Sequence, residues 1–195
     1  MSMPAIREVM IKIMSLIMLT ISINAVGADA KNDVVFETNK GTIVVTLNAE
    51  KAPGTVANFK SYVESGFYND TIFHRVIPGF MIQGGGFGAD IKRKPTQAAI
   101  QNEANNGLKN TVGTISMART GDPHSATSQF FINVNDNVNL DHVNTSLQGW
   151  GYAVFGQVVE GLELVIEVSR QATQPQQGHL NMPVDPVIIE KAFLR

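Results

Sequence analysis

From Thr71 to the C-terminus the chain is a succession of short apolar runs separated by Gly, Asn and Pro. Runs of about four to eight residues that are bounded by turn residues are typical of β-strands, whereas helices need longer periodic segments. The strand candidates are residues 72–76, 80–83, 112–118, 129–134, 153–159 and 186–194. Because helical runs are scarce over this length, the spacing predicts a mainly β fold.

The start of the folded region is predicted to be a hairpin. Residues 34–38 and 41–47 are rich in β-branched side chains and partly alternate between apolar and polar positions. The sequence Asn39-Lys40-Gly41 lies between them, and short connections of this composition favour hairpin turns.

Two helices are predicted among the strands. Ala52-Pro53 marks the start of the first, because proline is tolerated in the first helical turn. The apolar side chains that follow at helical spacing are Val56, Phe59 and Val63, and Gly66 is the expected end. Residues 161–169 show a second, shorter pattern. With polar loops at 88–111 and 135–151, many short strands and two helices predict a closed antiparallel β-barrel with helical caps.

The first thirty residues differ from the rest of the chain. Arg7 and Lys12 precede an apolar run at 13–26, and small residues follow up to Ala30. This order is typical of a secretory signal peptide, and the run is shorter than the roughly 20 residues that span a membrane. We expect residues 1–30 to be removed by cleavage near Ala28 or Ala30, which leaves 31–195 as one exported domain. An uncleaved membrane anchor is the alternative.

Composition excludes several classes of function. The chain has 15 Lys and Arg against 17 Asp and Glu, so it has no large basic field for nucleic acid. It has no Cys, which excludes disulfides, thiol nucleophiles and thiolate metal sites. Its four His lack the spacings of common metal sites, and the glycines at 84–86 do not continue into a dinucleotide or phosphate loop. No Gly-x-Ser-x-Gly hydrolase motif is present, and we expect neither metal nor cofactor.

A dense group of chemically useful side chains lies at residues 73–86, with the sequence Phe-His-Arg-Val-Ile-Pro-Gly-Phe-Met-Ile-Gln-Gly-Gly-Gly. After a turn at Pro78-Gly79, Phe80 or Met81 can face back toward Arg75 and form an apolar floor beside its guanidinium. The alternative is an ordinary hairpin with Phe80 and Met81 in the core and Arg75 in solvent. The glycines that follow are expected to permit a bulge or a close backbone approach.

This segment resembles the cyclophilin family of peptidyl-prolyl cis–trans isomerases when it is taken with Ser128-Gln-Phe-Phe-Ile132 and Val154-Phe-Gly156, which follow in the family's order. The resemblance runs from about Val34 to Ala192 and is strongest to the exported bacterial branch. It implies an eight-stranded antiparallel barrel with two helices, a packed interior and a substrate groove on the outside. It also implies catalysed rotation about X–Pro bonds that assists the folding of exported proteins, with the periplasm as the expected location.

The resemblance assigns a role to each of several positions. The family's catalytic arginine falls on Arg75. Its proline pocket carries over to Phe80, Met81, Phe131 and Leu140. Its contacts with the peptide backbone carry over to Gln83, Ala118 and Gln129. Tyr152 stands where many members have a groove histidine, and Arg119 stands where many eukaryotic members have asparagine. An alternative function is a proline-peptide-binding chaperone module with little catalysis, but the presence of Arg75 and the pocket residues favours an enzyme.

One departure concerns a drug-binding position. Many cyclophilins have Trp immediately before the residue matched by Leu140, and this chain has Asn139 there. Because that Trp helps to hold cyclosporin in the family, we expect weak cyclosporin binding, unless a loop bend brings Trp150 into its place. The expected partners are proline-containing polypeptides. We expect a monomer with no stable membrane association after cleavage, because no heptad pattern or long apolar stripe is present.

Overall fold

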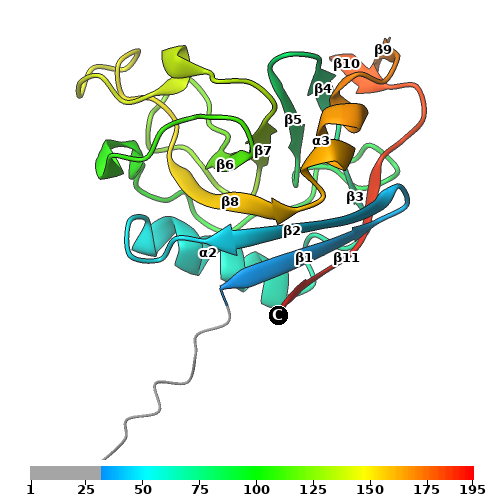
Figure 1. The fold of residues 1–195 in the computed structure, drawn as a ribbon, viewed down its shortest axis with the longest axis horizontal. Helices are drawn as coiled ribbons and strands as arrows, with labels where there is room; N and C mark the ends of the chain where they lie inside the picture. The colour runs from blue at the N-terminus through cyan, green and yellow to red at the C-terminus, as the bar shows by residue number, and fades with distance from the viewer. Residues whose placement is uncertain (1–31) are drawn as a thin grey trace, which may run out of the picture. The chain divides into compact units, whose positions relative to one another are not determined.

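The computed structural model describes residues 32–195, and the predicted signal peptide lies outside these residues. A nine-stranded antiparallel sheet dominates this part of the chain, in the order β3-β11-β1-β2-β8-β6-β7-β5-β4 (Figure 1). Its strands are β1 (Asp33–Thr38), β2 (Gly41–Leu47), β3 (Thr71–Ile72), β4 (Arg75–Ile77), β5 (Met81–Gly84), β6 (Thr114–Met117), β7 (Phe130–Asn133), β8 (Val154–Glu160) and β11 (Ile188–Leu194). No helix within the described residues is long and apolar enough to cross a membrane.

The two end strands of this sheet are neighbours in the chain. β3 and β4 stand at opposite ends of the strand order, and only Phe73 and His74 separate them. The sheet therefore curls until its ends meet through this short connection. The predicted strand 72–76 is thus interrupted between β3 and β4. If β3 and β4 are counted as one strand, the sheet has eight strands instead of nine. The expected mainly β, barrel-like architecture is confirmed.

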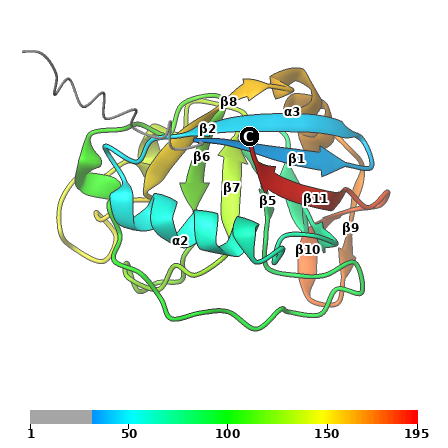
Figure 2. The ribbon, with the colours of Figure 1, turned by 90° about the horizontal axis from the view of Figure 1, so that it is seen from below.

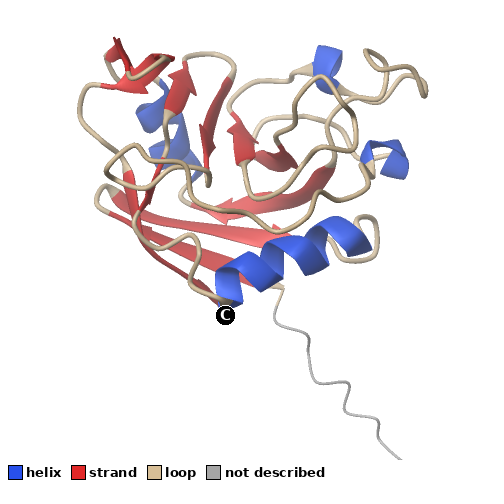
Figure 3. Cartoon of the chain, turned by 180° about the vertical axis from the view of Figure 1, so that it is seen from behind, coloured by secondary structure: helices blue, strands red, loops and turns tan. Residues whose placement is uncertain are grey.

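The two predicted helices are present as α2 (Pro53–Glu64) and α3 (Leu162–Ser169). Pro53 occupies the first helical turn of α2, and the residue before it offers no side-chain cap. A distant carboxylate takes over that task, because Glu103 accepts hydrogen bonds from the backbone N–H groups of Gly54 at 3.1 Å and Thr55 at 2.8 Å. Figures 2 and 3 show α2 lying against the sheet near β11, whereas α3 packs near β2, β4 and β5.

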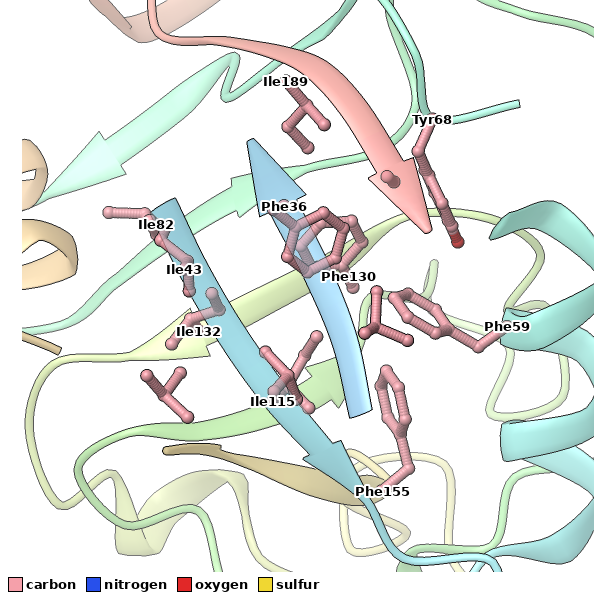
Figure 4. Close-up of a cluster of buried hydrophobic side chains, with 14 of the residues drawn as sticks. Phe36, Ile43, Phe59, Tyr68, Ile82, Ile115, Phe130, Ile132, Phe155 and Ile189 are labelled. Carbon is pink, nitrogen blue, oxygen red and sulfur yellow. The ribbon is translucent and has the colours of Figure 1, made fainter. Parts of the chain in front are cut away.

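Aromatic side chains fill the inside of the curled sheet. Phe36 from β1 stacks on Phe130 from β7 with ring centroids 5.4 Å apart, and Phe59 from α2 lies 4.9 Å from Phe155 of β8. All four are fully buried, and Figure 4 shows them surrounded by isoleucines of neighbouring strands. Because the interior is packed, a polypeptide ligand has to bind on the outside of the sheet.

A second, two-stranded sheet was not predicted. It consists of β9 (Thr173–Gln176) and β10 (His179–Pro183), joined at Gly178, which has a φ of 87°. β9 has no large apolar side chain, and in β10 only Leu180 and Met182 are large and apolar, so the hairpin carries little sequence signal for a sheet. The hairpin contacts the region of β4 through His179, whose ring lies 5.2 Å from the ring of His74.

Candidate active site

The hairpin of β4 and β5 places Arg75 opposite an amide side chain. Arg75 pairs with Gln83 and Ile77 pairs with Met81, around a turn at Pro78-Gly79. Nη1 of Arg75 lies 3.4 Å from Oε1 of Gln83. Gly79 has a φ of 68°, a conformation that glycine adopts without steric cost. The chain can therefore reverse tightly enough to put the cation and the amide side by side.

A depression of about 130 Å³ with both apolar and polar walls lies next to Arg75. Its walls come from both sides of the β4–β5 hairpin, from β7 and from the two loops that flank it. The lining residues are Arg75, Phe80, Met81, Gln83, Ala118, Arg119, Phe131, Leu140 and Tyr152. The sequence had singled out all nine, so Phe80 and Met81 both accompany Arg75, and the alternative of an isolated solvated arginine is wrong. We call this depression the Arg75 pocket.

Strand alternation explains why the pocket lies outside the core. Phe130 and Ile132 belong to the buried core, and Phe131 between them lines the pocket. In β5, Ile82 is in the core, while its neighbours Met81 and Gln83 face the pocket. Successive side chains of a strand point to opposite faces, so one pair of strands serves both the core and the site.

Gln129 is the one predicted site residue that does not line the pocket. Its Oε1 instead accepts a hydrogen bond from Nε2 of Gln83 at 3.0 Å, so Arg75, Gln83 and Gln129 form a chain of polar contacts. A Cβ at Gly86 would lie 2.6 Å from Cγ of Gln129. The expected close backbone approach at the glycine run is therefore confirmed, because a side chain at Gly86 would displace Gln129.

Arg119 and Tyr152 form one wall together. Cζ of Arg119 lies 4.5 Å from the centroid of the Tyr152 ring, a cation–π distance. Nε of Arg119 donates to the Gly151 carbonyl and Nη1 donates to the Thr120 carbonyl, both at 2.9 Å. The Tyr152 ring also meets Phe131 edge-on at 5.7 Å. The wall that Arg119 and Tyr152 form is thus a stacked pair with several anchors.

A buried amide network beneath the pocket was missed by sequence reasoning. Nδ2 of Asn137 donates to the Phe80 carbonyl at 2.8 Å and to Oδ1 of Asn133 at 2.7 Å. Oδ1 of Asp141 accepts from the backbone N–H of Asn110 at 2.8 Å. These contacts hold both flanks of the 3₁₀ helix η2 (Val138–Leu140), which carries Leu140. An asparagine at the end of the apolar run Phe130–Asn133 was the available signal, because a buried amide needs partners.

Trp150 lies in the loop before Gly151 and is held away from the pocket. Its Nε1 donates to the Asn102 carbonyl at 3.2 Å, and its ring meets His124 edge-on at 4.6 Å. Trp150 is not among the residues that line the Arg75 pocket. Asn139 is exposed on η2, so no indole stands at the position where many cyclophilins have one.

A buried histidine precedes Arg75. His74 is 3% exposed, and its Nδ1 has no hydrogen-bond partner in the part of the chain that the structure describes. Burial, helped by the nearby His179 and Arg75, lowers the pKa of His74 from 6.5 to about 3. The ring is therefore neutral at physiological pH, and Arg75 is the cation at this place. Among residues 32–195, no three His, Cys, Asp or Glu side chains are grouped so that they could hold a metal ion.

A larger hollow of about 670 Å³ lies elsewhere, along β2 and β8. It shares no lining residue with the Arg75 pocket, and its walls include Asn48, Glu50 and Lys109. This hollow is open, and none of its lining residues is aromatic. The smaller pocket therefore fits a proline ring better, despite its size.

Comparison with known proteins agrees with this geometry. Residues 33–193 match the family described as cyclophilin type peptidyl-prolyl cis-trans isomerase/CLD. A peptidyl-prolyl cis-trans isomerase B of Escherichia coli is 57% identical over 157 residues, which cover 80% of this chain and 96% of the relative. A peptidyl-prolyl cis-trans isomerase A of Dickeya dadantii is 48% identical over 186 residues, which cover 95% of this chain and 96% of the relative.

Solved structures show the same fold. A cyclophilin-type isomerase of Cryptosporidium parvum, crystallised in the presence of the dipeptide Ala-Pro, matches with a TM-score of 0.68 and 27% identity, over 84% of this chain and 98% of that one. A cyclophilin of Hirschia baltica matches with a TM-score of 0.67 and 26% identity, over 90% and 81% of the two chains. With its curled sheet and outer pocket, this chain belongs to the cyclophilin-type peptidyl-prolyl cis-trans isomerases.

Proposed function

We propose that the Arg75 pocket is where this isomerase turns X–Pro bonds, and that its clients are exported proteins during folding. The observation that carries the proposal is that the Arg75 guanidinium shares one depression with the apolar side chains of Phe80, Met81, Phe131 and Leu140. The depression is of the size and character that suit a proline ring. Arg75 lines the same depression, so its guanidinium can reach the amide nitrogen of a proline that binds there.

The reaction needs little besides this arrangement. Rotation of an X–Pro bond breaks no covalent bond, and the obstacle is amide resonance, with a barrier of roughly 18–20 kcal/mol. In the twisted transition state the prolyl nitrogen becomes pyramidal and gains a lone pair. A donor aimed at that nitrogen binds the twisted state more tightly than either planar state, and such differential binding accelerates the reaction.

Arg75 suits the role of this donor. A guanidinium is charged at any physiological pH and donates from a rigid fork. A charge-assisted hydrogen bond contributes about 1.5–3 kcal/mol, which corresponds to roughly ten- to a hundredfold in rate. The remaining acceleration has to come from holding the ring in the pocket and from polar groups such as Gln83 and Gln129 that orient the flanking peptide bonds.

The proposal of exported clients rests on the N-terminal sequence. Residues 1–30 have the positive start, apolar middle and small-residue end of a signal peptide, so we propose cleavage near Ala28 or Ala30 and a periplasmic, monomeric product. Mass measurement of the protein isolated from its native compartment tests this directly. A mature form that begins at Met1 would contradict it.

A refolding assay tests the function. Proline isomerisation limits the slow phase of many refolding reactions, over about 10–100 s at 25 °C. We expect catalytic amounts of this protein to shorten that phase. The second candidate function is a proline-peptide-binding module, and it would instead predict that stoichiometric amounts retard refolding without shortening the phase.

A further inference from the structure

A second hollow of about 90 Å³ adjoins the Arg75 pocket. The two share Gln83, Ala118 and Arg119 as walls, so a bound peptide that leaves the proline pocket past these residues enters the second hollow. Its other lining residues are Arg93, the Gln129 amide and the hydroxyl side chains of Thr120, Ser125 and Thr127. The second hollow is therefore lined mainly by polar side chains, with two arginines among them.

Positive charge around the two hollows is not balanced by their own walls. Arg75, Arg93 and Arg119 line one or both of them, and no Asp or Glu does. None of the ion pairs found among residues 32–195 includes any of these three arginines. The chain as a whole has a formal net charge of −2, so this local excess of positive charge is not a general property of the surface.

Asp90 and Asp122, the acidic residues that lie nearest in the sequence to Arg93 and Arg119, already have hydrogen-bond partners. Oδ1 of Asp122 accepts the backbone N–H of His124 at 2.9 Å. Asp90 pairs with Lys92 at 3.0 Å and also accepts the backbone N–H of Lys92. Neither carboxylate lines the second hollow, so neither neutralises Arg93 there.

Arg93 and Arg119 differ in how their donors are used. Arg119 donates hydrogen bonds from Nε and Nη1 to backbone carbonyls, and its guanidinium stacks on the Tyr152 ring. Arg93 is exposed, and its guanidinium makes no hydrogen bond or ion pair within the described part of the chain. All N–H donors of the Arg93 guanidinium are therefore available to a ligand. A carboxylate is the group whose two oxygens match the geometry of these donors.

We infer that this enzyme prefers substrates with an Asp or Glu side chain within two residues of the proline, and that Arg93 is the specificity-determining residue. The short distance follows from the shared walls, because an extended chain advances only about 3.3–3.6 Å per residue. The inference rests on the proposed function, since it takes the Arg75 pocket as the site of the proline.

Matched peptides test the inference on the full chain. In each pair one peptide has Glu and the other has Gln at a single position, one or two residues before or after the proline. The readout is the ratio of kcat/KM for Glu over Gln, because this ratio cancels any general loss of activity. At one position we expect a ratio of about two to five at low salt, the size of an exposed ion pair, and a ratio near one at about 1 M salt.

Charge substitution at Arg93 gives the decisive comparison. Arg93→Gln is expected to bring the ratio close to one, and Arg93→Glu is expected to reverse it and to favour a Lys peptide over the Gln peptide. Lys92→Gln is the matched control, because Lys92 is exposed and adjacent but lines neither hollow. In this control the ratio should persist.

Two results would overturn the inference. One is a ratio of one at every position while neutral peptides are turned over, which would leave the proposed function intact. The other is a preference for Glu that Arg93→Gln and Arg93→Glu leave unchanged. If no peptide of any charge is turned over, the assignment of the Arg75 pocket fails and this inference fails with it.

Discussion

Arg75 and Gln83 are direct partners in the antiparallel ladder of β4 and β5, and their side chains meet at 3.4 Å on the outer face of the sheet. Gln83 in turn donates to Gln129. The cation is thus held by backbone pairing and by a neighbouring amide, and it makes no ion pair within the described residues. An arginine held in this way retains its full charge for a ligand.

Replacement of Arg75 tests its proposed role. Arg75→Ala should lower kcat/KM for a proline peptide by about ten- to a hundredfold or more, because it removes the charged donor at the prolyl nitrogen. The side chain is half-buried and lies outside the core, so the thermal midpoint should change little. The measurement is isomer exchange by NMR beside a melting curve. Full activity in Arg75→Ala would refute the electrostatic role.

Phe131→Ala should impair both activity and stability. Phe131 is 4% exposed, lines the Arg75 pocket and packs on Tyr152. Truncation removes the floor of the pocket and leaves a cavity, at a cost of about 3 kcal/mol in the free energy of unfolding. Urea denaturation and peptide turnover measure the two effects. Phe131→Leu serves as the control that retains bulk, and unchanged turnover in Phe131→Ala would contradict the pocket.

The amide network under the pocket predicts an effect at a distance from the substrate. Asn137→Ala removes the donor to the Phe80 carbonyl and to Asn133. Because Asn133 is fully buried, its unpaired oxygen should cost about 1–3 kcal/mol of stability. Phe80 and Leu140 should then be held less firmly, so KM should rise more than kcat falls. A loss of stability without any change in KM would limit Asn137 to a structural role.

Cyclosporin is expected to inhibit weakly. Asn139 is exposed on η2, and Trp150 is engaged with Asn102 and His124 away from the pocket. No indole therefore covers the drug beside Leu140. Inhibition of peptide turnover measures the affinity, and Asn139→Trp should tighten it by at least about tenfold, about 1.4 kcal/mol. Nanomolar inhibition of the unmodified protein would contradict the prediction.

His74 predicts a pH dependence of stability. Its pKa is about 3 in the folded protein, mainly because of burial, against 6.5 for the free side chain. Between these values the unfolded chain binds a proton that the folded chain does not bind. The free energy of unfolding should therefore fall as pH is lowered from 6.5, by up to about 1.4 kcal/mol per pH unit from this residue.

The control for this effect is a residue that cannot titrate. His74→Phe should flatten the slope of unfolding free energy between about pH 4 and pH 6.5, as measured by urea denaturation at several pH values. The hydrogen bond from Thr46 holds the pKa of Asp33 below its usual value of 3.8. Protonation of this carboxylate therefore lowers the stability mainly at pH values below the range in which His74 is tested. Equal slopes in the two proteins would show that His74 is not the source.

The sequence alone was sufficient to predict those elements whose signals lie within a few neighbouring residues. The hairpin around Asn39 and Lys40, the start of α2 at Pro53 and the buried face of Val56, Phe59 and Val63 all follow from turn chemistry and helical spacing. The residues around Arg75 were also singled out, because their motifs and their order resemble the cyclophilin family, whereas the residues by themselves left an ordinary hairpin open. Their catalytic and binding roles remain predictions.

Only the tertiary structure decided how these pieces meet. The break at Phe73 and His74 that joins β3 to β4 depends on closure of the sheet between residues far apart in sequence. Likewise, the hairpin of β9 and β10 and the position of Trp150 depend on contacts across the fold. Local sequence encodes turns, faces and side-chain chemistry, but the closing of the sheet and the docking of loops follow from packing between distant segments, which no local pattern records.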